Sequence, residues 1–77
     1  MDSSLFKSYQ QLGLNIAFYR KAKRISQIEL AEKVNISRTH MSRIETADCA
    51  VSLDVVFRIC DALEVNPRDL FDFKPID

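Results

Sequence analysis

The chain has 77 residues, and its 11 Lys and Arg residues balance 11 Asp and Glu residues, so the formal net charge is zero. This length provides for one small domain with a single modest core, and we expect residues 1–77 to form that one domain. No apolar run is long enough to span a membrane, and the N-terminus lacks the pattern of a signal peptide. We therefore expect a cytoplasmic protein without a membrane partner.

The composition also argues against several kinds of chemistry. The chain has one glycine and no glycine-rich phosphate loop, and no serine, histidine and acid set has the spacing of a catalytic motif. Two cysteines and the lone His40 are too few for a structural zinc site, which normally takes four ligands. We expect no enzyme activity, no cofactor, no metal and no small-molecule ligand. Scarce Pro and Gly, with no alternating apolar pattern, predict an all-α fold.

The first helix is predicted from about residue 5 to residue 23. Apolar positions that repeat at three and four residues predict a core stripe, formed by Leu12, Ile16 and either Tyr19 or Phe18. Gly13 lies within this helix, where glycine costs about 1 kcal/mol relative to alanine. We therefore expect Gly13 to mark a close approach of another helix.

Two short helices joined by a tight turn are predicted over residues 26–45. Ser26 followed three residues later by Glu29 is a capping box, so the first of the two begins near Gln27. Its predicted inward positions are Leu30, Ala31 and Val34. Asn35 tolerates the left-handed conformation that a helix end needs before a sharp turn, and Ile36 can tuck beneath that turn.

The second of these helices is predicted to begin after Ser37 as its N-cap and to turn Met41 and Ile44 inward. Successive residues rotate by about 100°, which gathers polar side chains on the outer face: Arg38, Thr39, Ser42 and Arg43. Arginine can bond the O6 and N7 acceptors of guanine in the major groove of DNA, and threonine offers a hydroxyl and a methyl group. An ordinary solvated face is the alternative. His40 falls between the two faces and is assigned at most a supporting role.

A fourth helix is predicted from Ser52, its N-cap, to about Leu63. Its predicted inward side chains are Val56, Ile59, Cys60 and Leu63. Asn66 and Pro67 form an N-cap and first-turn pair for a short fifth helix, and Leu70 and Phe71 are expected to close the core. Cys60 is expected to be a small core residue, whereas Cys49, in a predicted loop, is the better candidate for an exposed thiol.

Charge is distributed unevenly along the chain. Residues 1–44 hold eight basic and three acidic groups, a balance of +5, whereas residues 45–77 hold three basic and eight acidic groups, a balance of −5. This asymmetry suggests a basic end that faces DNA and an acidic far end. Complementary contacts between copies of the chain are the alternative reading.

Residues 26–45 closely resemble the Cro/cI-type (XRE-like) helix-turn-helix repressors. That consensus runs Ser-Gln-x-x-Leu-Ala, then a hydrophobic residue and Ser, and finally a hydrophobic residue, Ser, x, a hydrophobic residue and Glu; each anchor is present here. Leu12-Gly13, Ile16-x-x-x-Arg20 and the run from Ile59 to Phe71 extend the resemblance to about residues 12–71.

The resemblance implies a compact five-helix, phage-repressor-like DNA-binding domain. It also implies a structural ion pair between Arg20 and Glu45, and a phosphate contact by Gln27 at the start of its helix, which we extend to Ser37. Residues 46–51 depart from the family pattern, because a loop that typically carries glycine, a basic residue and proline here has Asp48 and no lysine. This departure predicts fewer phosphate contacts, and so weak or dimer-dependent binding.

The sequence therefore predicts a DNA-binding transcriptional regulator that reads an inverted repeat in double-stranded DNA as a homodimer. A helical protein-interaction module, such as an antitoxin or adaptor, is the alternative. An apolar patch could pair two copies, with the alternative of a frayed terminus; its members would be Leu5, Phe6, Tyr9, Phe73 and Ile76.

Overall fold

The computed structural model describes residues 2–74, and Ile76 of the predicted apolar patch lies outside them. A short 3-10 helix is followed by five α-helices: η1 (Ser3–Leu5), α1 (Phe6–Ala22), α2 (Gln27–Val34), α3 (Arg38–Glu45), α4 (Leu53–Leu63) and α5 (Pro67–Leu70). No strand occurs within residues 2–74. The prediction of an all-α fold with five helices is confirmed.

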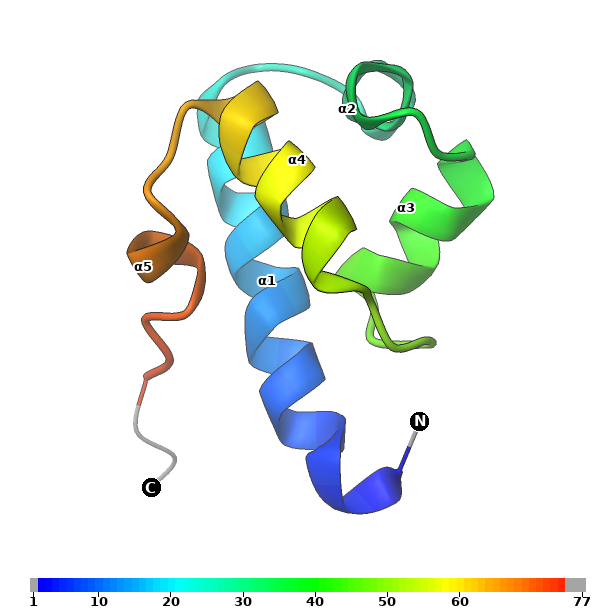
Figure 1. Ribbon diagram of the computed structural model, residues 1–77, viewed down its shortest axis with the longest axis vertical. Coiled ribbons are helices and arrows are strands. Elements are labelled where there is room, and N and C mark those ends of the chain that lie inside the picture. Colours follow the sequence, from blue (N-terminus) through cyan, green and yellow to red (C-terminus); the bar gives the residue numbers. More distant parts are fainter. Residues whose placement is uncertain (1, 75–77) are drawn as a thin grey trace.

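The long helix α1 is the support against which the other helices pack. It contacts α3, α4 and α5, and α2 contacts both α3 and α4. In Figure 1, α4 crosses in front of α1, with α2 and α3 on one side of the molecule and α5 on the other. This arrangement leaves one side of α3 without a neighbouring helix among the described elements.

The core draws on all five helices, and its fully buried large side chains are Ile16, Leu30, Val34, Met41, Val56, Ile59, Leu63 and Leu70. These residues match the predicted inward positions. Tyr19 packs against the core, whereas Phe18 is 65% exposed, which decides between the two alternatives for the α1 stripe. The prediction that Phe71 closes the core is wrong: α5 ends at Leu70, and Phe71 follows that end with 43% of its surface exposed.

Short polar side chains begin four of the helices. In each case a side-chain oxygen at the N-cap accepts a hydrogen bond from a backbone N–H in the first turn, and the caps are Ser26, Ser37, Ser52 and Asn66. At α2 the bond is reciprocal, because the carboxylate of Glu29 accepts from the backbone N–H of Ser26 at 3.1 Å. The predicted caps and the capping box are therefore confirmed.

The first four α-helices all end in the same way, with a left-handed residue that is not glycine. These residues, with φ between 56° and 62°, are Arg24, Asn35, Ala47 and Glu64. The next backbone N–H in each case returns to the carbonyl five residues earlier, as in the bond from Ile36 to Ala31 at 3.0 Å. This pattern is the Schellman motif, which satisfies carbonyl groups that the helix end would otherwise leave free.

Gly13 lies where α1 meets the end of α3. A Cβ built on Gly13 would lie 2.5 Å from the backbone oxygen of Ile44 and 2.6 Å from that of Glu45. These atoms belong to a helix backbone, which cannot rotate away as a flexible side chain would. The prediction of a close helix approach at Gly13 is confirmed, and this contact fixes the distance between α1 and α3.

We expect Gly13→Ala to lower the free energy of unfolding by about 1–3 kcal/mol, the usual cost of overpacking. The higher helix propensity of alanine offsets only about 1 kcal/mol of the strain. Urea denaturation followed by circular dichroism measures the difference. Ala17→Gly, a helix substitution of opposite direction at a half-buried position of α1, reports the propensity term together with the loss of one half-buried methyl group. Equal or greater stability of Gly13→Ala would contradict the close contact.

Candidate nucleic-acid interface

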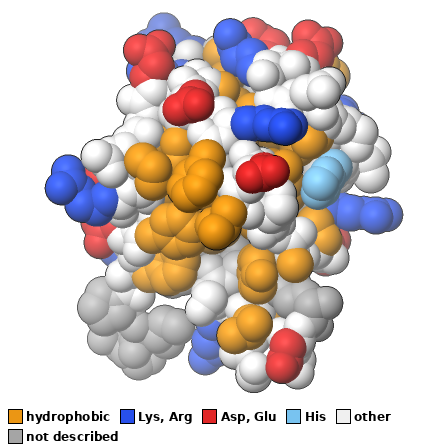
Figure 2. Space-filling model, viewed as in Figure 1, with side chains coloured by type: hydrophobic (Ala, Val, Ile, Leu, Met, Phe, Trp, Pro, Cys, Tyr) orange, Lys and Arg blue, Asp and Glu red, His pale blue; other side chains and the backbone are white. Residues whose placement is uncertain are grey.

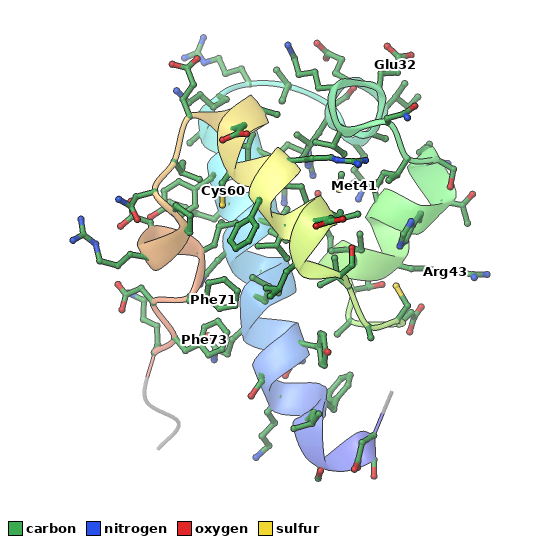
Figure 3. The ribbon with its side chains drawn as sticks, viewed as in Figure 1. Glu32, Met41, Arg43, Cys60, Phe71 and Phe73 are labelled. Atoms are coloured by element: carbon green, nitrogen blue, oxygen red, sulfur yellow. The ribbon has the colours of Figure 1, made fainter. Side chains whose placement is uncertain are left out.

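Helix α3 packs its apolar side against the core and therefore turns its polar side chains outward. Met41 and Ile44 are buried, and the hydroxyl of Ser37 caps the helix by accepting from the backbone N–H of His40 at 3.0 Å. The outer residues Arg38, Thr39 and Arg43 are exposed, while Ser42 and His40 are half-buried. Figure 3 shows Arg43 extending from α3 away from the rest of the molecule.

This face has the chemistry and the width for a groove of duplex DNA. Its two guanidinium groups are planar fork-shaped donors, and a single helix fits the major groove of B-DNA. The structure brings Arg38, Thr39, Ser42 and Arg43 together on one short helix of eight residues. Polar side chains at this spacing can reach the edges of adjacent base pairs.

Gln27, at the start of α2, is half-buried, and its side chain is hydrogen-bonded within the protein. Its side-chain nitrogen donates to Glu45 Oε1 at 3.0 Å. A carboxamide nitrogen carries two hydrogens, so one remains for an outside acceptor such as a phosphate oxygen. The first backbone N–H groups of α2 lie at the same end and have no intrahelical partner. The structure therefore places two kinds of donor at this helix start.

A buried ion pair joins the ends of α1 and α3. Arg20 Nε donates to Glu45 Oε2 at 2.7 Å, and Arg20 Nη2 donates to Glu45 Oε1 at 3.0 Å. Arg20 Nη1 also donates to the carbonyl of Ile25 at 2.9 Å, in the turn before α2. Arg20 and Glu45 are only 8% and 9% exposed, so they serve the packing of the helices and are not available to DNA.

The part of Gln27 in this network was not predicted from the sequence. Glu45 Oε1 accepts from both Arg20 and Gln27, so one carboxylate connects all three helices around the turn. Nothing in the residue pattern indicates that a glutamine at the start of α2 reaches the last residue of α3. This contact arises from the way α2 and α3 cross in the folded protein, which brings Gln27 to Glu45.

Charges around this surface differ in sign. Lys21, Lys23 and Arg24 are exposed at the end of α1, next in sequence to the start of α2. The loop after α3 carries the exposed Asp48, whose backbone N–H bonds to the carbonyl of Arg43 at 2.8 Å. The positive charge therefore lies before α2 and on α3, and the loop that follows α3 contributes none.

The cysteines lie apart from the α3 face. Cys60 is buried in the core, and burial raises the pKa of its thiol, with a further rise from the negative charge of Asp61. Cys49 is the more accessible of the two cysteines, as predicted, but it is half-buried and packs against the core. Residues 2–74 contain no group of three potential metal ligands, and none of their helices is long and apolar enough to cross a membrane.

Two curated proteins resemble this chain in sequence. The control protein C.BamHI of Bacillus amyloliquefaciens is 44% identical over 52 residues, which cover 68% of this chain and 64% of that protein. The antitoxin PezA of Streptococcus pneumoniae is 36% identical over 59 residues, which cover 77% of this chain and 37% of that protein. The chain therefore spans less than two thirds of the length of either relative.

The fold is also shared with a solved protein. The restriction-modification controller protein C.AhdI of Aeromonas hydrophila superposes with a TM-score of 0.82 at 29% identity, covering 86% of this chain and all of that one. The family model for the Cro/C1-type helix-turn-helix DNA-binding domain matches residues 15–75, most of the chain. The match includes the turn, α3 and both members of the buried ion pair. The chain belongs to the Cro/C1-type helix-turn-helix family of DNA-binding domains.

Proposed function

We propose that this protein is a sequence-specific DNA-binding transcriptional regulator that inserts α3 into the major groove of an inverted-repeat operator. The observation that carries the proposal is the outer face of α3, where Arg38, Thr39 and Arg43 are exposed. The opposite side of the helix is buried in the core. Relatives named as a control protein and a controller protein support the regulatory role. Because residues 26–45 resemble the Cro/cI-type repressors, repression is the form of regulation that we propose.

Each residue of the surface has a proposed task. Arg38 and Arg43 bond guanine edges or adjacent phosphates, Thr39 supplies a hydroxyl and a methyl contact to neighbouring bases, and Ser42 supplies a hydroxyl contact. Gln27, with its remaining amide hydrogen, and Ser37, with its hydroxyl hydrogen, donate to phosphate oxygens. Phosphate contacts fix the position of a protein on the duplex, while base contacts select the sequence.

We further propose that residues 1–77 act as a single cytoplasmic domain that uses no cofactor. The alternative, a protein-interaction module without DNA binding, is not favoured by the family match, although one relative is named an antitoxin. The exposed arginines of α3 support the DNA reading, because they lie on one face of a helix that the family match assigns to a DNA-binding domain.

Selection from a random duplex pool at low salt tests this function. We expect enrichment of one two-fold symmetric site, with affinity that falls steeply as salt rises, because released counterions drive phosphate binding. Absence of any enriched site would remove the recognition role of α3 and would favour the protein-interaction alternative.

The homodimer that an inverted repeat requires has a suitable face on this chain. A groove of about 340 Å³ lies between the start of α1, the start of α4 and the segment after α5. Its walls are mainly apolar and comprise Leu5, Ser8, Tyr9, Leu12, Val51, Leu53, Val56, Phe71 and Phe73. Figure 2 shows hydrophobic side chains gathered over α4 and on the surface just below α4 in this view. We call this surface the groove face.

A second copy of the chain is the occupant that the groove face fits. Leu53 and Phe57 of α4 are 61% and 48% exposed, so apolar side chains project beside the hollow. In a two-fold interface the same patch meets itself, and a projection on one copy must find a hollow on the other. The groove face offers both. The predicted apolar patch is thereby extended to α4, which the sequence analysis did not include.

We expect Leu53→Asp to weaken self-association by at least about tenfold, because Leu53 lines the groove and is 61% exposed, and a buried unpaired carboxylate is costly at an interface. Sedimentation equilibrium over a range of concentrations measures the dimer dissociation constant. Phe18→Asp is the matched control, since Phe18 is 65% exposed on α1 but does not line the groove. Equal weakening by both variants, or by neither, would contradict the assignment of the interface to the groove face.

A further inference from the structure

The segment that follows α5 lies against α1, and one side chain of α1 holds it there. Asn15 Nδ2 donates to the carbonyl of Leu70 at 2.8 Å and to the carbonyl of Asp72 at 3.3 Å. These carbonyls belong to residues 55 and 57 positions further along the chain. Asn15 therefore links the middle of α1 to the last residue of α5 and to the turn that follows it.

The other hydrogen bonds of this segment are local. The backbone N–H of Phe71 bonds to Pro67 at 3.2 Å, and that of Phe73 bonds to Phe71 at 2.9 Å. Among residues 2–74, Asn15 supplies the hydrogen bonds between residues 70–73 and another helix. Both hydrogens of its amide nitrogen are used, one for each carbonyl, which an isosteric carboxylate could not provide.

The segment held by Asn15 forms one wall of the groove face. Phe71 and Phe73, whose ring centroids lie 6.1 Å apart, both line the groove. Figure 3 shows these two rings beside α1 and below α4. Asn15 does not line the groove but a separate surface hollow, together with Asp69, Asp72 and Lys74. Asn15 can therefore influence a partner in the groove through the position of the two phenylalanines.

We propose that Asn15 is a positioning residue for the homodimer: its amide fixes the segment that carries Phe71 and Phe73, and so completes the groove face for a second copy. This inference rests on the proposed dimer. Without the two bonds, the segment retains only local hydrogen bonds and the packing of Leu70. The rings then sample several positions, and each partner must order them again on association.

Two variants of Asn15 separate its hydrogen bonds from its shape. Asn15→Asp keeps the shape but, at pH 7, points a carboxylate at two carbonyl oxygens, with Asp69 and Asp72 as further negative groups and Lys74 as the one positive group in the same hollow. We expect the dimer dissociation constant to rise about tenfold or more, because two ordinary hydrogen bonds are lost and the carboxylate also repels the two carbonyl oxygens. Asn15→Ala, which lacks the donor but adds no charge, should cause a smaller rise.

Acidification provides a readout that a merely structural role would not produce. A protonated carboxyl carries one O–H donor and can again bond one carbonyl. As the pH falls from 7 toward 4, where an ordinary aspartate becomes protonated, dimerisation of Asn15→Asp should recover toward that of the wild type at the same pH. Asn15→Ala should show no such recovery. The wild type measured in parallel accounts for the other titrating groups.

Sedimentation equilibrium of the full chain, with thermal melting as the check on folding, decides the matter. Gln11→Ala is the control, because Gln11 lines the same hollow on α1 but makes no hydrogen bond to the segment among the described residues. Dimer constants that stay at the wild-type value in both Asn15 variants would overturn the inference. A wild type that is monomeric at all concentrations would instead overturn the proposed dimer, and the inference with it. If Asn15→Asp does not fold, Asn15→Ala against Gln11→Ala gives the decision.

Discussion

Replacing Arg38 and Arg43 together with alanine is expected to lower the affinity for the selected operator by about a thousandfold. Each bidentate arginine contact with guanine contributes about 1–3 kcal/mol of discrimination, and a factor of ten corresponds to about 1.4 kcal/mol. Both side chains are exposed on α3, so the free energy of unfolding should change by less than about 0.5 kcal/mol. Fluorescence anisotropy with labelled operator, and urea denaturation, measure the two quantities.

Two further double variants show whether the loss comes from charge or from contact. Arg58→Ala with Arg68→Ala removes the same charge from exposed positions on α4 and α5, and should leave affinity within a few-fold of the wild type. Arg38→Lys with Arg43→Lys keeps the charge but loses the planar fork, and should retain nonspecific binding while losing preference for the operator. Equal affinities in all four proteins would rule out α3 as the recognition helix.

The helix starts and the core were predictable because their determinants are local. Ser26, Ser37, Ser52 and Asn66 each cap the helix that follows them, through bonds to backbone groups no more than three residues away. The inward faces follow from a repeat of three and four residues, which the helical period fixes whatever the neighbouring elements are. A sequence contains all that these two features require.

Helix ends were harder to predict than helix starts, since three of the four residues with positive φ are of types that do not favour this conformation. Asn35 was predicted, because asparagine tolerates positive φ, but Arg24, Ala47 and Glu64 adopt it without glycine or asparagine. Packing compensates at several ends: Ile25, Ile36 and Val65 follow the left-handed residue and pack against the core. The chain reverses where that side chain can be buried, and burial depends on the other helices.

The site shows the same division between local and long-range causes. Periodicity placed Arg38 and Arg43 on one outer face, but it could not show that Gln27 shares the Glu45 carboxylate with Arg20. Similarly, Phe71 follows an apolar pattern that suits a core residue, yet α5 ends one residue earlier and leaves its ring in the wall of the groove. These contacts depend on how elements cross, which no local pattern specifies.

Glu45→Ala is expected to lower the free energy of unfolding by about 3–5 kcal/mol, the usual effect of removing one partner from a buried ion pair. Arg20 would keep its charge in a site where it is 8% exposed, and Gln27 would lose its acceptor as well. Small domains are stable by only about 5–15 kcal/mol, so a large part of the stability depends on this carboxylate. Urea denaturation at constant pH measures the change.

Glu32→Ala is the matched control, because Glu32 projects into solvent from α2 (Figure 3). This replacement should lower the free energy of unfolding by less than about 0.5 kcal/mol. Arg20→Met combined with Glu45→Leu removes both charges at once, and should recover much of the stability lost in Glu45→Ala, since no unpaired charge stays buried. That recovery would not restore DNA binding fully, because Gln27 would still lack the acceptor that orients its amide toward phosphate. A double variant as unstable as Glu45→Ala would show that the hydrogen bonds of the carboxylate, and not the balance of charge, hold the three helices around the turn.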